Sequence, residues 1–251
     1  MTTPEEPTTT GRTADRPREA PGRAAWVSVV LLLVGAAALC LWRTGDRGLW
    51  SSHEARAARV AMTMLDTGDW VVPQLAPGEP TYQKPPLFYW LVVLASRAGG
   101  GEVTPLAARL PSALATVLTA LVVYLLARDI KGHRAGLLAG IAFVTCARLM
   151  WVSRVAVLDP LLGLWVTLAL YLFHRAYRRG AGWAGYLWCG APLGLGLLTK
   201  GPIALVLPAT VVVLFLLWEA VRRRLAGGAM ATLAWPCCPS RGSHAHAPRR
   251  G

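Results

Sequence analysis

Long apolar runs, each nearly free of charge, alternate in this sequence with short clusters of arginine and lysine. A run of about 18 residues is long enough to cross the hydrocarbon core of a bilayer as a helix. The chain as a whole is 54% hydrophobic and still has a formal net charge of +13. A soluble domain of that composition would have too few polar residues to cover its surface. The sequence therefore predicts an integral membrane protein built from several helices.

Six of the apolar runs are expected to span the membrane, which makes the predicted fold an all-α polytopic helical bundle. These runs cover residues 25–42, 106–127, 135–152, 157–173, 183–198 and 202–218. Basic clusters precede the first run and follow the second, fourth and sixth, so simple alternation puts all four on one side. Positive charge is concentrated in cytoplasmic loops, so this side, which includes the N-terminus, is predicted to be cytoplasmic.

The chain divides into three parts by composition. Residues 1–24 are rich in Thr, Pro, Glu and Arg and are predicted to be a disordered cytoplasmic tail. Residues 25–225 form the predicted transmembrane domain, with a long outer loop at 44–105. Residues 226–251 are rich in Cys, Pro, His and Arg and do not resemble a further helix. We interpret this last part as disordered, out-of-frame or truncated sequence, in which the adjacent cysteines lack zinc-site spacing.

The basic balance does not indicate a nucleic-acid partner, because no basic stretch on a soluble domain is interleaved with aromatic residues. The expected partner of the chain surface is the lipid bilayer. No acidic cluster has the ligand density of a dedicated metal site. We therefore expect no cofactor and no metal-binding residues, and the sequence leaves open whether a divalent cation assists any reaction.

Two further helices are expected on the outer side. Residues 85–96 are strongly apolar but too short for a span, so they are placed as an interfacial or re-entrant helix with Tyr89 and Trp90 at headgroup level. The segment that follows Ser51 carries apolar residues at helical spacing and ends near Gly68. It is predicted to be an amphipathic helix lying on the outer membrane surface.

Ser51 and Glu54 have the spacing of a capping box at the start of this amphipathic helix. Glu54 is therefore either a helix cap or a carboxylate at the mouth of a membrane cavity, next to His53. Taken alone, this segment favours the cap, because caps are common.

Three more charged residues lie inside or at the ends of apolar runs. Lys84 precedes two prolines, which fix its backbone direction, although a lone lysine at a membrane boundary is usually an anchor. Asp159 interrupts an apolar stretch and needs a wet cavity or a partner; a simple ion pair with Arg154 is the plain alternative. Lys200 is a further cation between two spans.

Several stretches of the sequence, taken in order, resemble a known family. They are HEARAARVAMTMLDTGDWVVPQL, then YQKPPLFYWL, then LAARLPSALATVLTALVVYLLAR, followed by the Asp-bearing and TKGP turns. Residues 49–217 resemble the N-terminal half of polytopic glycosyltransferases of GT-C type. The similarity is to the aminoarabinose transferases of lipid A and to the broader dolichyl-phosphate-mannose protein mannosyltransferase family.

The resemblance implies transfer of a sugar from a polyprenyl-phosphate carrier to a lipid, protein or glycan acceptor at the outer face of the cytoplasmic (inner) membrane. Breaking the glycosyl-phosphate bond leaves negative charge on the phosphate, which cations can stabilise. The residues expected to bind the donor phosphate are Lys84, Arg56, Arg59 and Lys200. The expected catalytic residues are Glu54 as general base, His53 and Asp159, the last orienting the sugar or Lys84.

Two departures from the family pattern keep other functions open. His53 stands where the family typically has an aspartate, so Glu54 is the only carboxylate of that pair. Family members also have more spans and often a soluble C-terminal domain. The alternatives are a truncated, non-catalytic membrane protein, or a fragment of a transporter or flippase in which Asp159 and Lys200 are pathway charges.

Overall fold

A computed structural model describes residues 23–226, and most of these residues are helical. The helices are α1 (Arg23–Leu41), α2 (Ser52–Thr67), α3 (Leu87–Ala98), α4 (Pro105–Lys131), α5 (His133–Thr145), α6 (Ala147–Ser153), α7 (Asp159–Arg179), α8 (Trp183–Leu187), α9 (Gly190–Lys200) and α10 (Ile203–Ala226). A short antiparallel pair of strands, β1 (Gln74–Ala76) and β2 (Glu79–Pro80), was not expected from the sequence.

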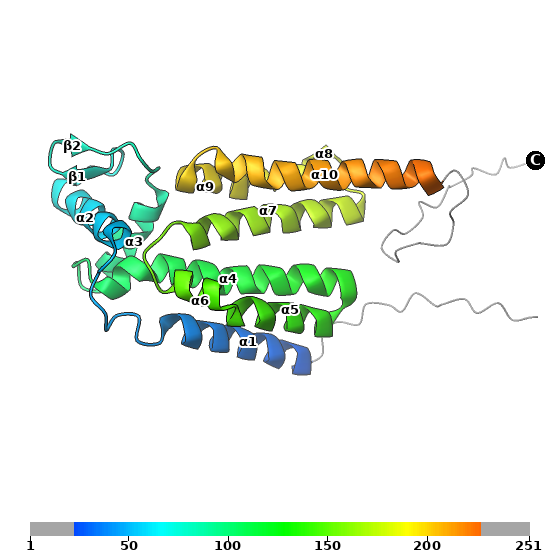
Figure 1. Ribbon diagram of the computed structural model, residues 1–251, viewed down its shortest axis with the longest axis horizontal. Coiled ribbons are helices and arrows are strands. Elements are labelled where there is room, and N and C mark those ends of the chain that lie inside the picture. Colours follow the sequence, from blue (N-terminus) through cyan, green and yellow to red (C-terminus); the bar gives the residue numbers. More distant parts are fainter. Residues whose placement is uncertain (1–22, 227–251) are drawn as a thin grey trace, which may run out of the picture.

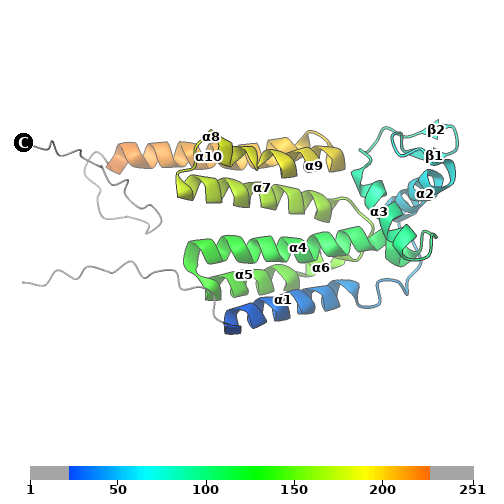
Figure 2. The ribbon, with the colours of Figure 1, turned by 180° about the vertical axis from the view of Figure 1, so that it is seen from behind.

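The helices form an elongated bundle with two different ends (Figure 1). α1, α4, α5, α7, α9 and α10 run along the long axis, while α2, α3 and the strand pair gather at one end. The view from behind shows the same division (Figure 2). Three of the four predicted basic clusters lie at the α4–α5 turn and at the ends of α7 and α10, all towards the opposite end of the bundle. We call these two ends the α2 end and the basic end.

Three described helices are long and apolar enough to cross a membrane: α1, α4 and α10. A fourth span results if α5 and α6, which bend by 64° at Cys146, are taken together. Helix α7 and the α8–α9 segment run beside them but do not meet the same criteria of length and apolarity. The all-α polytopic fold is thus confirmed, whereas the count of six spans stays a prediction.

Helix α4 is the axis of the bundle, since it contacts α1, α3, α5, α6 and α7. Small residues let α5 approach both α4 and α1 closely. A Cβ added to Gly136 would meet the ring and carbonyl of Tyr124 on α4 at 2.8 Å, and a Cβ added to Gly140 would meet Leu32 on α1 at 2.6 Å. This spacing of two glycines four residues apart is typical of closely packed membrane helices.

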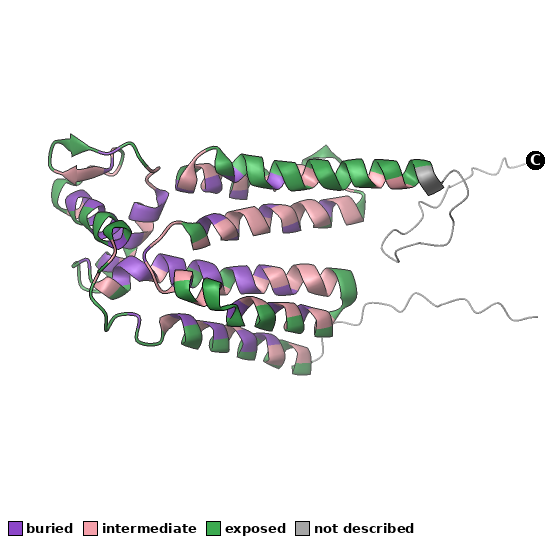
Figure 3. Cartoon of the chain, in the orientation of Figure 1, coloured by how far each residue is buried: buried purple, intermediate pink, exposed green. Residues whose placement is uncertain are grey.

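The structure shows which protein elements cover α2 and α3. The apolar face of α2 packs against α3 and α4 in one protein core instead of against lipid, and Tyr89 on α3 is only 3% exposed. Trp90 donates a hydrogen bond from Nε1 to the carbonyl of Trp70 at 2.7 Å. Figure 3 shows the resulting concentration of buried residues where α2, α3 and α4 meet. Protein neighbours thus cover Tyr89 and half-bury Trp90, and the placement of these two residues at headgroup level stays a prediction.

The predicted tails, 1–24 and 226–251, lie outside the described residues except at their inner edges. Arg23 and Ala24 belong to α1, and Ala226 is the last residue of α10. The interpretation of Cys237, Cys238, His244 and His246 falls entirely outside the described part of the chain.

Phe88 and Leu94 on α3 offer a test of this core. Phe88 is 0% exposed and Leu94 is 54% exposed. We expect Phe88→Ala to lower the free energy of unfolding by about 3–5 kcal/mol, because it leaves a cavity in a packed core. Thermal unfolding of the detergent-solubilised protein measures this loss, with Leu94→Ala as the matched control. Equal effects of the two substitutions would contradict the buried position of α3.

Candidate active site

All the residues predicted to act in chemistry lie on segments at the α2 end of the bundle. His53, Glu54, Arg56 and Arg59 are on α2, and Lys84 lies between β2 and α3. The last two, Asp159 and Lys200, are the first residue of α7 and the last residue of α9. The fold therefore brings to one end residues that the sequence separates by up to 147 positions (200 − 53 = 147).

Helix α2 begins with the predicted cap, but Glu54 has another role. The side-chain oxygen of Ser51 accepts a hydrogen bond from the Glu54 amide at 3.2 Å. The Glu54 side chain turns inward instead of completing a capping box, and both it and the Arg109 side chain are 0% exposed. Arg109 Nε donates to Glu54 Oε1 at 2.7 Å, and Nη2 donates to Oε2 at 3.2 Å. The two residues thus form a buried, bidentate ion pair between α2 and α4.

The remaining donors of Arg109 bind the loop between α1 and α2. Nη1 donates to the carbonyls of Thr44 at 2.6 Å and Arg47 at 2.8 Å, and Nη2 donates to Gly48 at 2.9 Å. A guanidinium has five N–H donors, and all five are used here. A buried charge with every hydrogen bond satisfied avoids the penalty of an unpaired one.

The same carboxylate also binds the turn between α6 and α7. The Ala156 amide donates to Glu54 Oε1 at 3.1 Å. Beside it, the Ser112 hydroxyl on α4 donates to the Val157 carbonyl at 2.8 Å and accepts from the Val157 amide at 3.3 Å. Residues 154–158 are therefore held between α2 and α4, immediately before Asp159.

The charge state of Glu54 follows from these contacts. Burial by itself raises the pKa of the Glu54 carboxyl, but hydrogen bonds from Arg109 and the Ala156 amide, with the charge of Arg109, outweigh it. The net result is a pKa below the ordinary value. Glu54 is thus ionised at neutral pH, with both oxygens already accepting hydrogen bonds.

Asp159 pairs with a cation other than the one considered from the sequence. Its carboxylate forms an ion pair with Lys200, whereas Arg154 donates to the carbonyl of Trp42. The Asp159 side chain is 61% exposed and that of Lys200 is 28% exposed. Trp165 Nε1 donates to the buried Thr199 hydroxyl at 3.1 Å, which aligns α7 with α9 next to this pair. The pair is accessible, unlike Glu54 and Arg109.

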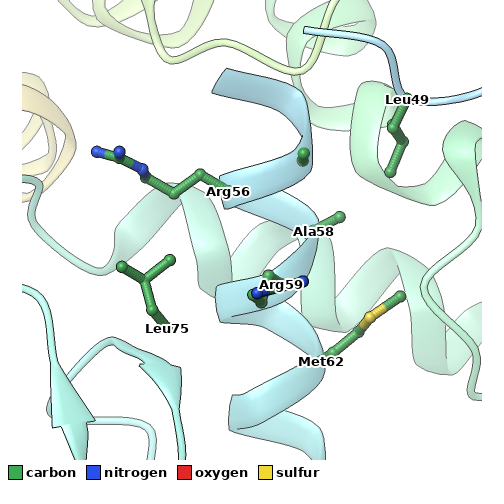
Figure 4. A pocket seen from close by; sticks show the side chains of 7 residues that line it. Leu49, Arg56, Ala58, Arg59, Met62 and Leu75 are labelled. Atoms are coloured by element: carbon green, nitrogen blue, oxygen red, sulfur yellow. The ribbon is translucent and has the colours of Figure 1, made fainter. Parts of the chain in front are cut away.

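The other predicted cations lie on α2 or in the segment between β2 and α3. Arg56 is exposed and donates to the side-chain oxygen of Gln83, the residue that precedes Lys84. Lys84 is half-buried and, among residues 23–226, forms no hydrogen bond or ion pair. In Figure 4, Arg56 and Arg59 leave α2 in different directions around an open hollow of about 380 Å³. The hollow is lined by Leu49, Ala55, Arg56, Ala58, Arg59, Met62 and Leu75.

The T-G-D-W stretch, residues 67–70, ends α2 and leads into the strand pair that precedes α3. Gly68 ends α2 in the left-handed conformation with φ of 71°. Asp69 accepts hydrogen bonds from the amides of Val71 at 2.9 Å and Val72 at 3.2 Å. The guanidinium of Arg97 lies 4.9 Å from the centre of the Trp70 ring, so this turn also holds the far end of α3.

His53 is exposed beside Glu54 on the first turn of α2. No group of three or more His, Cys, Asp or Glu side chains that would hold a metal ion occurs among the described residues. Arg109 is the residue that sequence reasoning missed. Its signal was a lone arginine inside the apolar run LAARLPSALATVL, where a charge needs a partner.

Comparison with known proteins adds a family and a set of relatives. The family model for dolichyl-phosphate-mannose-protein mannosyltransferase matches residues 52–228. The chain is 35% identical over 209 residues to an undecaprenyl phosphate-alpha-4-amino-4-deoxy-L-arabinose arabinosyl transferase of Pseudomonas aeruginosa, and this match covers 81% of the chain and 38% of the relative. A second such transferase, from Sodalis glossinidius, is 37% identical over 71% of the chain and 32% of its own length.

Solved structures resemble the fold at similar coverage. ArnT from Cupriavidus metallidurans bound to undecaprenyl phosphate has a TM-score of 0.69 and 27% identity, over 80% of this chain and 38% of that one. An oligosaccharyltransferase from Archaeoglobus fulgidus, at 18% identity and a TM-score of 0.57, shares the fold alone. The chain thus spans less than two fifths of the length of these relatives.

The buried pair predicts a pH-dependent stability. Because the folded-state pKa of Glu54 is lowered, its contribution is present above the ordinary carboxyl pKa of about 4.3 and is lost as pH falls through the lower folded value. At pH 7 we expect Glu54→Gln to lower the free energy of unfolding by about 3–5 kcal/mol, because it leaves Arg109 buried without its anion. Unfolding midpoints at pH 7 and pH 3 measure the difference between variant and wild type. The difference should shrink at pH 3; one that stays constant would show that Glu54 is not ionised in the fold.

Proposed function

We propose that this chain, which belongs to the dolichyl-phosphate-mannose-protein mannosyltransferase family, takes part in transferring a sugar from a polyprenyl-phosphate carrier to an acceptor. The α2 end of the bundle is the proposed site. The likeness of the chain to ArnT bound to undecaprenyl phosphate supports a donor of that lipid class. The relatives in Pseudomonas and Sodalis favour an undecaprenyl-phosphate-linked aminoarabinose donor. The resemblance to the aminoarabinose transferases of lipid A favours a lipid acceptor over protein or glycan acceptors.

The observation that carries the proposal is Lys84, a half-buried cation without a partner among the described residues, at the start of the apolar helix α3. A hydrogen bond joins Arg56 to Gln83, the residue that precedes Lys84. Two cations at the α2 end suit the phosphate of such a donor, since charge-assisted hydrogen bonds stabilise the phosphate as it leaves the sugar. We assign Arg59 and Lys200 supporting roles as further positive charges that attract the donor phosphate.

We assign the roles of the predicted catalytic residues by how accessible their side chains are. Asp159 has an exposed carboxylate, so we propose that it meets the sugar or the acceptor hydroxyl. The base role predicted for Glu54 requires its pair with Arg109 to open, because both oxygens already accept hydrogen bonds. His53, exposed at the start of α2, is the proposed alternative base near neutral pH.

A transporter reading is less well supported by the positions of the charges. Pathway charges lie near the middle of the bilayer, whereas Asp159 and Lys200 are at helix ends. The hypothesis that the chain is a truncated, non-catalytic membrane protein is tested by the transfer assay.

The assay uses membranes that contain the chain, a radiolabelled undecaprenyl-phosphate-linked aminoarabinose, and separate lipid, protein and glycan acceptor extracts. We expect label to move to the lipid extract. Lys84→Ala and Asp159→Asn should each reduce transfer by about 10²-fold or more, as is typical when one transition-state contact is removed. Lys131→Ala, an exposed lysine at the basic end, is the control and should leave the rate unchanged.

The assay is repeated with the remaining length of a relative supplied, because the chain spans only 38% of such proteins. If inserted wild-type protein transfers no label under either condition, the chain is not part of a working transferase. Equal rates for Lys84→Ala and wild type would instead remove Lys84 from the site.

We further propose that the α2 end faces the outside of the inner membrane and the basic end faces the cytoplasm, because positive residues concentrate on the cytoplasmic side. In a variant with the five native cysteines replaced by serine, Tyr82→Cys, at a position 83% exposed, should react with a membrane-impermeant maleimide in spheroplasts. Arg179→Cys, exposed at the basic end, should react only after permeabilisation. The reverse pattern would invert the topology.

A further inference from the structure

Arg109 lies in the second turn of α4, the most buried of the three helices that are apolar enough to cross a membrane. Its side chain is wholly buried and every donor is used. Replacing a buried ion pair with apolar residues is often neutral or stabilising for a fold. Stability alone is therefore a weak reason for this pair, and its geometry suggests another.

The pair connects three segments that are distant in sequence. Arg109 donates hydrogen bonds to carbonyls of the α1–α2 loop and to the Glu54 carboxylate. Glu54 Oε1 then accepts the amide of Ala156 at 3.1 Å. Arg109 thus acts on the α6–α7 turn through a single oxygen atom.

A second contact from α4 holds the same turn. Ser112, three residues after Arg109 and so on a neighbouring part of the helix face, binds both the amide and the carbonyl of Val157. Asp159 follows two residues later and opens α7, where it pairs with Lys200. A shift of the turn would carry the Asp159 carboxylate with it.

We infer that Arg109 is a positioning residue. Its pair with Glu54 holds residues 154–158 in place, and this fixes the position of the Asp159 carboxylate in the proposed site. The inference rests on the proposed function for its catalytic consequence. A lysine cannot replace Arg109 in this role, because it has three donors on a flexible stem instead of five in a planar fork. Small displacements of reacting groups reduce rates strongly, by about 10²-fold for 1 Å.

Two measurements test the inference, both on the full chain in nanodiscs. In Arg109→Lys we expect kcat for transfer to fall by about 10²-fold, while the donor KM changes by less than about threefold. Hydrogen exchange should accelerate at the amides of residues 154–158 and at the α1–α2 loop, with the middle of α4 and α7 unchanged. Arg43→Gln removes an exposed ion pair, with Asp46, in the same loop. It is the matched control and should change neither quantity.

A second variant covers the case in which Arg109→Lys does not fold. The double substitution Glu54→Met with Arg109→Met removes both charges together, which is tolerated far better than removing one. The folded double variant should show the same local increase in exchange and the same loss of kcat.

Unchanged kcat in either variant, or an increase in exchange spread evenly over the bundle, would overturn the positioning role. Absence of transfer by the wild-type chain counts against the proposed function instead. The exchange measurement then still decides whether Arg109 holds the turn, since local acceleration supports this and uniform acceleration refutes it.

Discussion

The buried ion pair between Glu54 and Arg109 is the interaction on which the α2 end of this protein depends. One guanidinium satisfies three loop carbonyls and one carboxylate, and that carboxylate satisfies a backbone amide from a third segment. In a low-dielectric interior such a network is favourable only when every member has its partners. Its geometry therefore sets the path of the α1–α2 loop and of the turn before α7 together.

The two ends of the bundle have different physical tasks. The basic end carries arginines that remain exposed or half-buried at helix termini, as expected of residues that set orientation in a bilayer. At the α2 end the charges are sorted by burial: Glu54 and Arg109 are enclosed, whereas Asp159, Arg56 and Arg59 reach the surface. Enclosed charges organise the backbone and exposed ones are available to a substrate, which is the arrangement that a pre-organised site requires.

Local pattern was sufficient where neighbouring residues decide the outcome. The Ser51 cap, the Gly68 stop and the apolar periodicity of α2 were predicted from the sequence and are confirmed. The same periodicity could not say what covers the apolar face. An amphipathic helix buries that face against lipid or against protein with equal ease, and here α3 and α4 cover it. For this reason Tyr89 is buried by protein neighbours.

The sequence by itself determined that this chain is an all-α membrane protein and which side chains stand at the helix ends, because apolar length, basic clusters and capping are local properties. It also indicated the family through motifs quoted from residues 49–217. Only the tertiary structure decided the partners: Glu54 with Arg109, 55 residues away, and Asp159 with Lys200 instead of Arg154. A partner depends on how α2, α4, α7 and α9 pack, and no local pattern encodes the distance between atoms on separate helices.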